Sequence, residues 1–212
     1  MEINKKVFKK NYESSSLFRK LYRNFGGWMA TQFAKTSITP IQVGYMRLVM
    51  LSFTYYLIYY NHFFVGALVL YIAIALDYTD GSLARINNQV SKFGEWFDGA
   101  SDNVGLVALL FFIGISTDVM VGCISIIISY LMCRSIFLLY KRIYQESADN
   151  VIEGVKKNQF ISCLYYNELF ILNGCVIFLL INRIEWFIWF CSIYGWLFYV
   201  AMLTIFTWRA SK

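Results

Sequence analysis

Residues 77–102 read DYTDGSLARINNQVSKFGEWFDGASD and place four aspartates and an arginine between two long apolar runs. Ionisable side chains at membrane depth are rare unless they face a cavity, pair with one another or bind metal. We therefore interpret this stretch as a functional site. Acidic residues that merely cap helix ends in a loop would account for the carboxylates, but not for the glycines, the alanine and the arginine in register with them.

The aspartates follow helical spacing at both ends of the stretch. If the first apolar run is a helix that continues into the motif, one face carries Asp77, Asp80, Gly81 and Ala84. The start of the next helix carries on one face Gly94, Asp98 and Asp102. Two such faces would gather four carboxylates, which suit magnesium, manganese or calcium better than zinc. Because unneutralised charges repel strongly in a poorly screened site, the spacing predicts a divalent-cation site with a pair of ions.

The complete pattern is Asp-x2-Asp-Gly-x2-Ala-Arg-x8-Gly-x3-Asp-x3-Asp, starting at Asp77. It resembles the signature of the class I CDP-alcohol phosphotransferases, also called CDP-alcohol phosphatidyltransferases. The resemblance implies a membrane enzyme in which a hydroxyl group attacks one phosphorus of a CDP-linked alcohol and CMP leaves. It also implies a homodimer and a role in phospholipid biosynthesis.

The resemblance implies a role for each position of the motif. Two Mg²⁺ or Mn²⁺ ions would clamp the diphosphate, held by Asp77, Asp80, Asp98 and Asp102. Asp102 would also act as the general base on the acceptor hydroxyl. The nucleotide and the diphosphate would be bound at Gly81, Ala84, Arg85 and Gly94. Arg85 would pair with the diphosphate through its planar guanidinium group or, alternatively, form a structural ion pair with one of the acids.

The composition is that of an integral membrane protein. Hydrophobic residues make up 58% of the 212 residues and the mean hydropathy is +0.52, whereas soluble domains have roughly 45–50% apolar residues. The five cysteines lie in apolar runs and lack a C-x-x-C spacing, so they predict neither a disulfide framework nor a zinc site. We interpret them as lipid-facing or packing residues, and His62, beside Asn61, as a solvated turn residue.

Residues 1–36 form a separate basic segment. Lysines and arginines are interleaved there with large apolar residues, without a run long enough to span a bilayer and without a signal-peptide pattern. We predict an amphipathic helix lying at the membrane surface over about residues 14–35. Anionic lipid explains the net charge of +6, and no nucleic acid is expected as a partner.

Six predicted transmembrane helices fill the second segment, residues 37–212, so the predicted fold class is all-α. Each apolar run is close to the roughly 20 residues that cross the hydrocarbon core. The predicted spans are 41–60, 62–86, 94–116, 118–140, 160–181 and 184–208. Thr39 and Pro40 predict the N-cap and first turn of the first span. The polar connection 145–158 is predicted to cover the site.

Basic residues outside the spans fall mainly on one side of the membrane. If the N-terminus is cytoplasmic, that side carries Arg85, Lys92, Lys141, Arg142, Lys156, Lys157, Arg209 and Lys212. The other side carries Arg183. Because cytoplasmic loops are enriched in lysine and arginine, we predict that both termini and the site face the cytoplasm. A prokaryotic cell membrane is favoured over an organelle membrane.

Three charged residues lie outside the motif and away from the ends of the predicted spans. Arg47 and Arg134 either reach the interface by snorkelling or hold an anion on the acceptor. Glu168 should face the interior or a cavity, where it either contacts the acceptor or braces the helix bundle. Arg134 and Glu168 are therefore candidate acceptor-binding residues.

The acceptor itself is left open by the motif. Pro40 is followed by Ile41 and Gln42 where many family members have asparagine, and residues 98–103 match neither the glycerophosphate-type nor the inositol-phosphate-type pattern. We predict transfer of a substituted phosphate from CDP-diacylglycerol or an ether analogue to a hydroxyl acceptor. The alternatives are transfer from a soluble CDP-alcohol of the choline or ethanolamine type to diacylglycerol, a divalent-cation transporter or metal sensor, and a catalytically silent scaffold.

Overall fold

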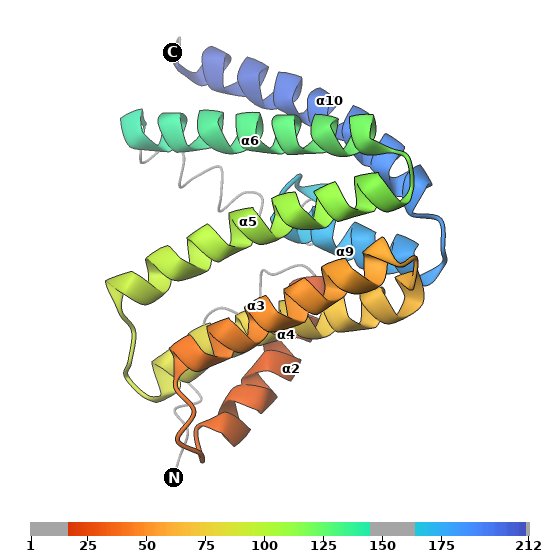
Figure 1. Ribbon diagram of the computed structural model, residues 1–212. Coiled ribbons are helices and arrows are strands. Elements are labelled where there is room, and N and C mark those ends of the chain that lie inside the picture. Colours follow the sequence, from red (N-terminus) through yellow and green to blue (C-terminus); the bar gives the residue numbers. More distant parts are fainter. Residues whose placement is uncertain (1–16, 145–163, 211–212) are drawn as a thin grey trace.

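The computed structural model describes residues 17–144 and 164–210 (Figure 1). Within these ranges the chain forms seven helices and no strand, which confirms the predicted all-α class. The helices are α2 (Leu17–Phe33), α3 (Pro40–Tyr59), α4 (Phe63–Ile86), α5 (Lys92–Ser116), α6 (Met120–Ile143), α9 (Glu168–Leu180) and α10 (Ile184–Ala210). The predicted cover over the site, residues 145–158, lies outside the described residues.

Five of these helices are long and apolar enough to cross a membrane: α3, α4, α5, α6 and α10. Their bounds lie within a few residues of the predicted spans. The chain is therefore a multi-pass membrane protein.

The remaining predicted span is a shorter helix. The prediction that it begins near residue 160 is wrong, because residues 165–167 are not helical and α9 begins at Glu168. Asn167 caps the helix by accepting a hydrogen bond from the backbone N–H of Phe170 at 2.9 Å. At 1.5 Å per residue, the 13 residues of α9 extend about 20 Å, less than the roughly 30 Å of the hydrocarbon core.

Local sequence signals explain where the helices begin. Thr39 accepts a hydrogen bond from Gln42 N and the Gln42 side chain accepts one from Thr39 N, which is the capping box expected before Pro40. Ser91 caps α5 by accepting a hydrogen bond from Gly94 N at 3.0 Å. Helix α4 ends at Ile86 and α5 begins at Lys92, so the two halves of the motif are joined by a short connection.

Four of the turns between helices share one backbone feature: those joining α3 to α4, α4 to α5, α5 to α6 and α9 to α10. Each of these four contains a residue with φ between 53° and 59°: Asn61, Asn88, Asp118 and Asn182. Asparagine and aspartate adopt this left-handed conformation more readily than other non-glycine residues, because their short polar side chains bond locally. The chain reverses at each of these positions and so builds antiparallel helix pairs.

The helices pack as a bundle in which α3 lies along α4, and α6 lies along α10 (Figure 1). The core between them is apolar and includes Leu70, Leu106, Leu109, Ile126 and Ile171, each at most 2% exposed. The described cysteines, Cys123, Cys133, Cys175 and Cys191, are free and buried, so they act as packing residues. Cys163 lies outside the described residues.

The predicted amphipathic helix is confirmed as α2, but it docks on the bundle rather than only resting at its surface. Gly26 allows the close approach, since a Cβ there would lie 2.9 Å from Tyr78 Cβ and 3.0 Å from the Ala75 carbonyl oxygen on α4. Tyr22 of α2 is 2% exposed and donates a hydrogen bond to Asn173 Oδ1 of α9 at 2.9 Å. Helix α2 therefore joins α4 and α9.

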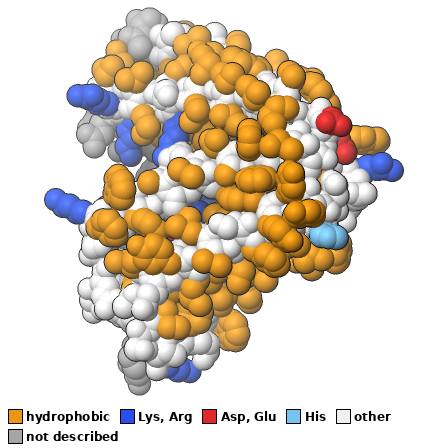
Figure 2. Space-filling view, in the orientation of Figure 1, with side chains coloured by type: hydrophobic (Ala, Val, Ile, Leu, Met, Phe, Trp, Pro, Cys, Tyr) orange, Lys and Arg blue, Asp and Glu red, His pale blue; other side chains and the backbone are white. Residues whose placement is uncertain are grey.

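The outer surface shows how the bundle sits in a bilayer. Figure 2 shows apolar side chains over most of the visible face, while most visible lysine and arginine side chains lie on the left of the view, the side on which α4 joins α5 in Figure 1. Apolar surface of this extent suits contact with lipid. Tyr56, Tyr60, Trp186 and Trp208 are among the exposed aromatic residues.

Candidate active site

Three of the four motif aspartates come together between α4 and α5. One carboxylate oxygen from each of Asp77, Asp98 and Asp102 lies within 4.8 Å of the other two. Asp77 is on α4 and the other two are one turn apart on α5, as the helical spacing predicted. Asp77 and Asp102 lie about two and a half turns or more from the ends of α4 and α5 that the short connection joins, and Asp98 lies fewer than two turns from it.

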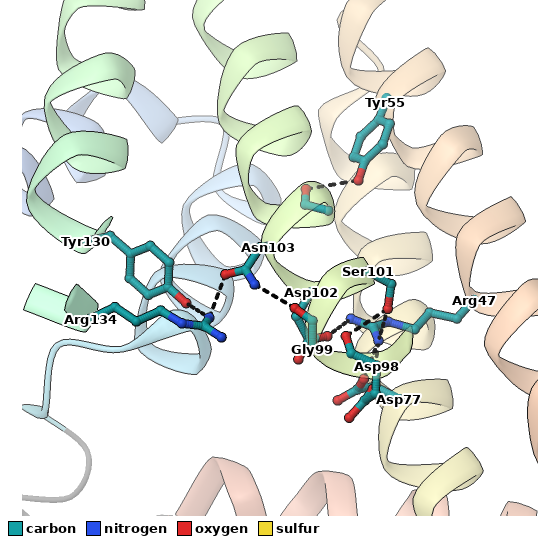
Figure 3. A network of polar contacts seen from close by, with 11 residues as sticks. Arg47, Tyr55, Asp77, Asp98, Gly99, Ser101, Asp102, Asn103, Tyr130 and Arg134 are labelled. Carbon is teal, nitrogen blue, oxygen red and sulfur yellow. Dashed lines mark hydrogen bonds and ion pairs between the residues drawn. The ribbon is translucent and has the colours of Figure 1, made fainter. Parts of the chain in front are cut away.

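Arg47 of α3 contacts all three carboxylates (Figure 3). Its Nη1 atom lies 2.5 Å from Asp77 Oδ1 and 3.4 Å from Asp98 Oδ1, and its Nη2 atom donates to Asp102 Oδ1. Arg47 is only 6% exposed, so the snorkelling interpretation is wrong for this residue. The guanidinium group lies among the carboxylates because, in a poorly solvated place, each charge needs an opposite charge beside it.

The carboxylates are a suitable donor set for a divalent cation. They offer several oxygen atoms at one place, which is what Mg²⁺ and Mn²⁺ require. Asp77 Oδ1 is buried and accepts no hydrogen bond of good geometry from the described residues, although it is ion paired with Arg47. A buried oxygen with an unused lone pair is unfavourable unless a ligand or a cation reaches it.

Asp80 lies one turn beyond Asp77 on α4 and is not part of the three-carboxylate cluster. Its Oδ2 atom faces α3, where a Cβ on Gly44 would lie 3.8 Å away. The nearest atom to that Cβ would be Phe97 Cε1 at 3.0 Å, so the absence of a side chain at Gly44 makes room for the Phe97 ring. The structure therefore places one motif acid at the edge of the cluster rather than in it.

The other motif residues line neighbouring turns, and the one charged side chain among them, Arg85, pairs with no acid among the described residues. Arg85 is exposed and its Nη2 atom donates to Ser82 Oγ at 3.3 Å on the same helix. Among the described residues it forms no ion pair, so the alternative of a structural pair with an aspartate is not observed. Gly81 and Ala84 are half-buried, and the N–H of Gly94 bonds Ser91.

Arg134 of α6 is held on the other side of α5. Its Nη1 atom donates to Asn103 Oδ1 at 2.5 Å and to Tyr130 OH at 3.0 Å (Figure 3). Asn103 in turn donates to the Gly99 carbonyl oxygen at 2.6 Å. These bonds fix the guanidinium group next to Asp102 along α5, so Arg134 is not free to snorkel.

A cavity of about 470 Å³ lies between these groups. Asp77, Asp102, Arg47, Arg134 and Glu168 provide charged parts of its wall, and residues such as Leu51, Leu70, Ile74, Leu106 and Phe137 provide apolar parts. Glu168, the first residue of α9, is half-buried. The structure thus brings both candidate acceptor residues to the same cavity as Asp102.

Sequence reasoning missed how two polar residues act here. Arg47 was weighed as a snorkelling or anion-binding residue, and its contact with the motif was not foreseen. The signal that could have found it is its place about two turns into the first span, the same depth as Asp77 and Asp102. Asn103, directly after the last motif aspartate, was not considered as a partner for Arg134.

The fold and site define a helical membrane protein with a carboxylate cluster that opens onto an internal cavity. The family model of the CDP-alcohol phosphatidyltransferases matches residues 37–207. The chain belongs to this family of enzymes, which confirms the resemblance noted in the motif. Members use divalent cations, and the cluster of Asp77, Asp98 and Asp102 could bind one.

A characterised relative is similar over part of the chain. Archaetidylinositol phosphate synthase of Pyrococcus horikoshii is 32% identical over 113 residues, which are 48% of this chain and 57% of the relative. The match therefore spans little more than half the length of that enzyme. Together with the family, it supports phospholipid headgroup transfer as the general activity.

Proposed function

We propose that the chain transfers a phosphatidyl-type group from CDP-diacylglycerol, or an ether analogue, to a hydroxyl acceptor with release of CMP. The observation that carries the proposal is the carboxylate cluster at one wall of a largely apolar cavity. The name of the Pyrococcus horikoshii relative supports a lipid-linked donor, since that enzyme makes archaetidylinositol phosphate.

The motif residues would act on the donor. Asp77, Asp98 and Asp102, with Asp80 at the edge, would hold two divalent cations, Mg²⁺ or Mn²⁺. When bound, such ions neutralise diphosphate charge and the charge that develops on the leaving group. Gly81, Ala84 and Gly94 leave the helix surface open for the nucleotide, and exposed Arg85 is within reach of solvent to pair with the diphosphate.

Asp102 would be the general base. Its carboxylate lines the cavity, where an acceptor hydroxyl can approach it. The hydroxyl proton passes to Asp102 as the acceptor oxygen bonds to the lipid-side phosphorus. The bond from that phosphorus to the bridging oxygen breaks, and CMP leaves with the electron pair. Arg47, which bonds Asp102, keeps the carboxylate oriented.

The sidedness of the protein follows from charge. The basic residues at the end of the bundle that holds the joined ends of α4 and α5 support a cytoplasmic site with both termini on the same side. CDP-linked substrates are supplied there. The homodimer implied by the family resemblance also stays a prediction.

The test is CMP release by purified protein in detergent with Mg²⁺, CDP-diacylglycerol and a panel of hydroxyl acceptors. Acceptor-dependent release by the native protein is expected, with turnover at least about 100-fold lower in Asp102→Asn, the contribution typical of a general base. Asp118→Asn, at a turn on the opposite side where asparagine is equally tolerated, is the control.

A loss confined to donor affinity in Asp102→Asn would contradict the general-base role. Release supported only by CDP-choline or CDP-ethanolamine with diacylglycerol would contradict the lipid-linked donor and favour the soluble-donor alternative.

A further inference from the structure

Among the described residues, the Glu168 carboxylate has no hydrogen-bond or ion-pair partner. It lies at the first residue of α9, half-buried and on the cavity wall. In the described part of the chain, no hydrogen bond and no ion pair within 4.0 Å reaches its side-chain oxygens. A carboxylate at membrane depth is costly unless a positive or hydrogen-bonding group meets it. The structure therefore leaves a place beside Glu168 for such a group on a ligand.

The charges that face Glu168 come from three other helices. They are the carboxylates of Asp102 and Asp98 on α5 and the guanidinium groups of Arg47 on α3 and Arg134 on α6. Arg47 is already engaged by three aspartates. Arg134 is the other guanidinium group that faces Glu168, and it does not approach Glu168 to within ion-pair distance.

Arg134 keeps hydrogen-bonding capacity for a ligand. Only its Nη1 atom bonds protein atoms among the described residues, with Asn103 and Tyr130. The N–H groups on Nη2 and Nε have no such acceptor there. Those bonds fix the position of the guanidinium group while leaving donors available, which is how an arginine is prepared to bind a carboxylate.

Glu168 and Arg134 thus lie apart from each other on the wall of the cavity, which also carries Asp102, Asp77, Arg47 and Arg19. Resting on the proposed function, we propose that the acceptor is a hydroxyl-bearing zwitterion, of which a β-hydroxy amino acid is the simplest kind. Its ammonium group binds Glu168 and its carboxylate binds Arg134. Its hydroxyl oxygen then bonds to the lipid-side phosphorus, the hydroxyl proton passes to Asp102, and CMP leaves with the electron pair.

Two physical arguments favour a zwitterion over an anionic acceptor. A zwitterion brings no net charge into a poorly solvated cavity. Its ammonium group would also compensate the Glu168 carboxylate, and its carboxylate would accept from the remaining N–H groups of Arg134. A phosphorylated polyol would instead pair its phosphate with the guanidinium groups that face this place, Arg47 and Arg134, and leave Glu168 without a counter-charge. A buried charge left unpaired in this way disfavours a competing substrate.

The test compares four acceptors with purified protein, Mg²⁺ and CDP-diacylglycerol. L-Serine carries both charged groups, ethanolamine only the ammonium group, glycerate only the carboxylate, and inositol 1-phosphate an anionic phosphate. We expect kcat/KM for serine to exceed that for each of the others by at least about tenfold, the discrimination that one missing buried charge contact produces.

The variant Glu168→Gln should raise the KM for serine by about tenfold or more while leaving kcat/KM for glycerate unchanged or higher. Binding of labelled serine in the absence of donor should weaken by the same factor. Glu185→Gln is the matched control, because Glu185 is also a half-buried glutamate in the first turn of a helix. It should change neither value.

The outcomes separate this inference from the proposed function. CMP release that is driven best by inositol 1-phosphate, or a serine KM unchanged in Glu168→Gln, would overturn the inference and leave lipid-linked transfer standing. Absence of CMP release with every acceptor, in protein that binds Mn²⁺ and remains folded, would overturn both.

Discussion

Arg47 joins three helices through one guanidinium group: it extends from α3, lies 2.5 Å from Asp77 on α4, and contacts Asp98 and Asp102 on α5. Arg47 thus supplies positive charge to a cluster of acids that could bind a cation. A cation bound there would compete with Arg47 for carboxylate oxygens.

Replacing Arg47 with methionine should destabilise the protein most when divalent cations are removed. Three carboxylates would then face one another without a counter-charge, and breaking a buried ion pair by removing one partner costs about 3–5 kcal/mol. We expect a lower unfolding temperature in detergent with EDTA, with much of the loss restored by Mg²⁺.

Arg85→Met is the control for this experiment, because Arg85 is exposed and bonds only Ser82 on its own helix. It should change stability by about 0.5 kcal/mol or less. Equal destabilisation of Arg47→Met with EDTA and with Mg²⁺ would show that Arg47 acts through packing alone.

Asp77→Asn and Asp98→Asn should each weaken cation binding. Each removes a charged oxygen donor from the cluster within which the three acids lie 4.8 Å or less apart. We expect Mn²⁺ affinity, followed by electron paramagnetic resonance, to fall at least about tenfold, with loss of CMP release. The control is Glu95→Gln, because Glu95 is an exposed residue in the first turn of α5, and this variant should keep the native Mn²⁺ affinity. An unchanged Mn²⁺ affinity in the aspartate variants would show that the cluster does not bind cations.

Asp80 gives a separate prediction about the number of ions. Because it stands at the edge of the cluster formed by the other three acids, Asp80→Asn should remove one Mn²⁺ ion from a pair and leave the other. Titration of Mn²⁺ would show a stoichiometry of about two in the native protein and one in the variant, as expected for a two-ion site. An unchanged stoichiometry would exclude Asp80 as a ligand.

Gly26→Ala should loosen the contact between α2 and α4. The added Cβ would lie 2.9 Å from Tyr78 Cβ and 3.0 Å from a backbone oxygen, so a helix must move, at a cost of about 1–3 kcal/mol. The unfolding temperature should fall. The control is Gly99→Ala, because a Cβ there meets nothing within 4 Å, and this variant should be more stable by up to about 1 kcal/mol. A similar fall in the unfolding temperature of Gly99→Ala would refute the steric argument.

High pH should weaken the docking of α2 through Tyr22. Burial raises the pKa of the Tyr22 hydroxyl, and Tyr71 and Tyr78 add to the shift. The unfolded chain then ionises at about pH 10 while the docked hydroxyl stays neutral, so this contribution is fully present below pH 10 and is lost as pH rises above it. The unfolding temperature measured from pH 8 to 11 should fall more steeply for the native protein than for Tyr22→Phe. If the unfolding temperatures of the two proteins fall in parallel, Tyr22 is not the group responsible.

Much of the fold could be predicted from the sequence because hydropathy and helix-start signals act locally. Apolar runs gave the five long helices to within a few residues, and Thr39 with Pro40 gave the start of α3. The start of α9 could not be predicted in this way. The apolar residues before Glu168 have the same composition as a span, but Asn167 turns out of the helix to cap it.

The site could be predicted only as far as helical periodicity reaches. Spacing along one chain segment placed Asp77, Asp98 and Asp102 on two facing surfaces, and the cluster confirms this. Arg47 comes from another helix, 30 residues before Asp77, and no local pattern relates them. Its role depends on the crossing of α3 over α4, which is a property of the packed bundle.

The depth of the acid cluster has a consequence for the lipid substrate. Asp77 lies about 13 Å along α4 from the end of that helix, inside a span long and apolar enough to cross a membrane. The proposed lipid-linked donor could then reach the cluster while its chains remain in their leaflet. Extracting a lipid into water costs about 0.8 kcal/mol for every methylene group exposed; a site within the span would avoid that cost and would release the product into the same leaflet.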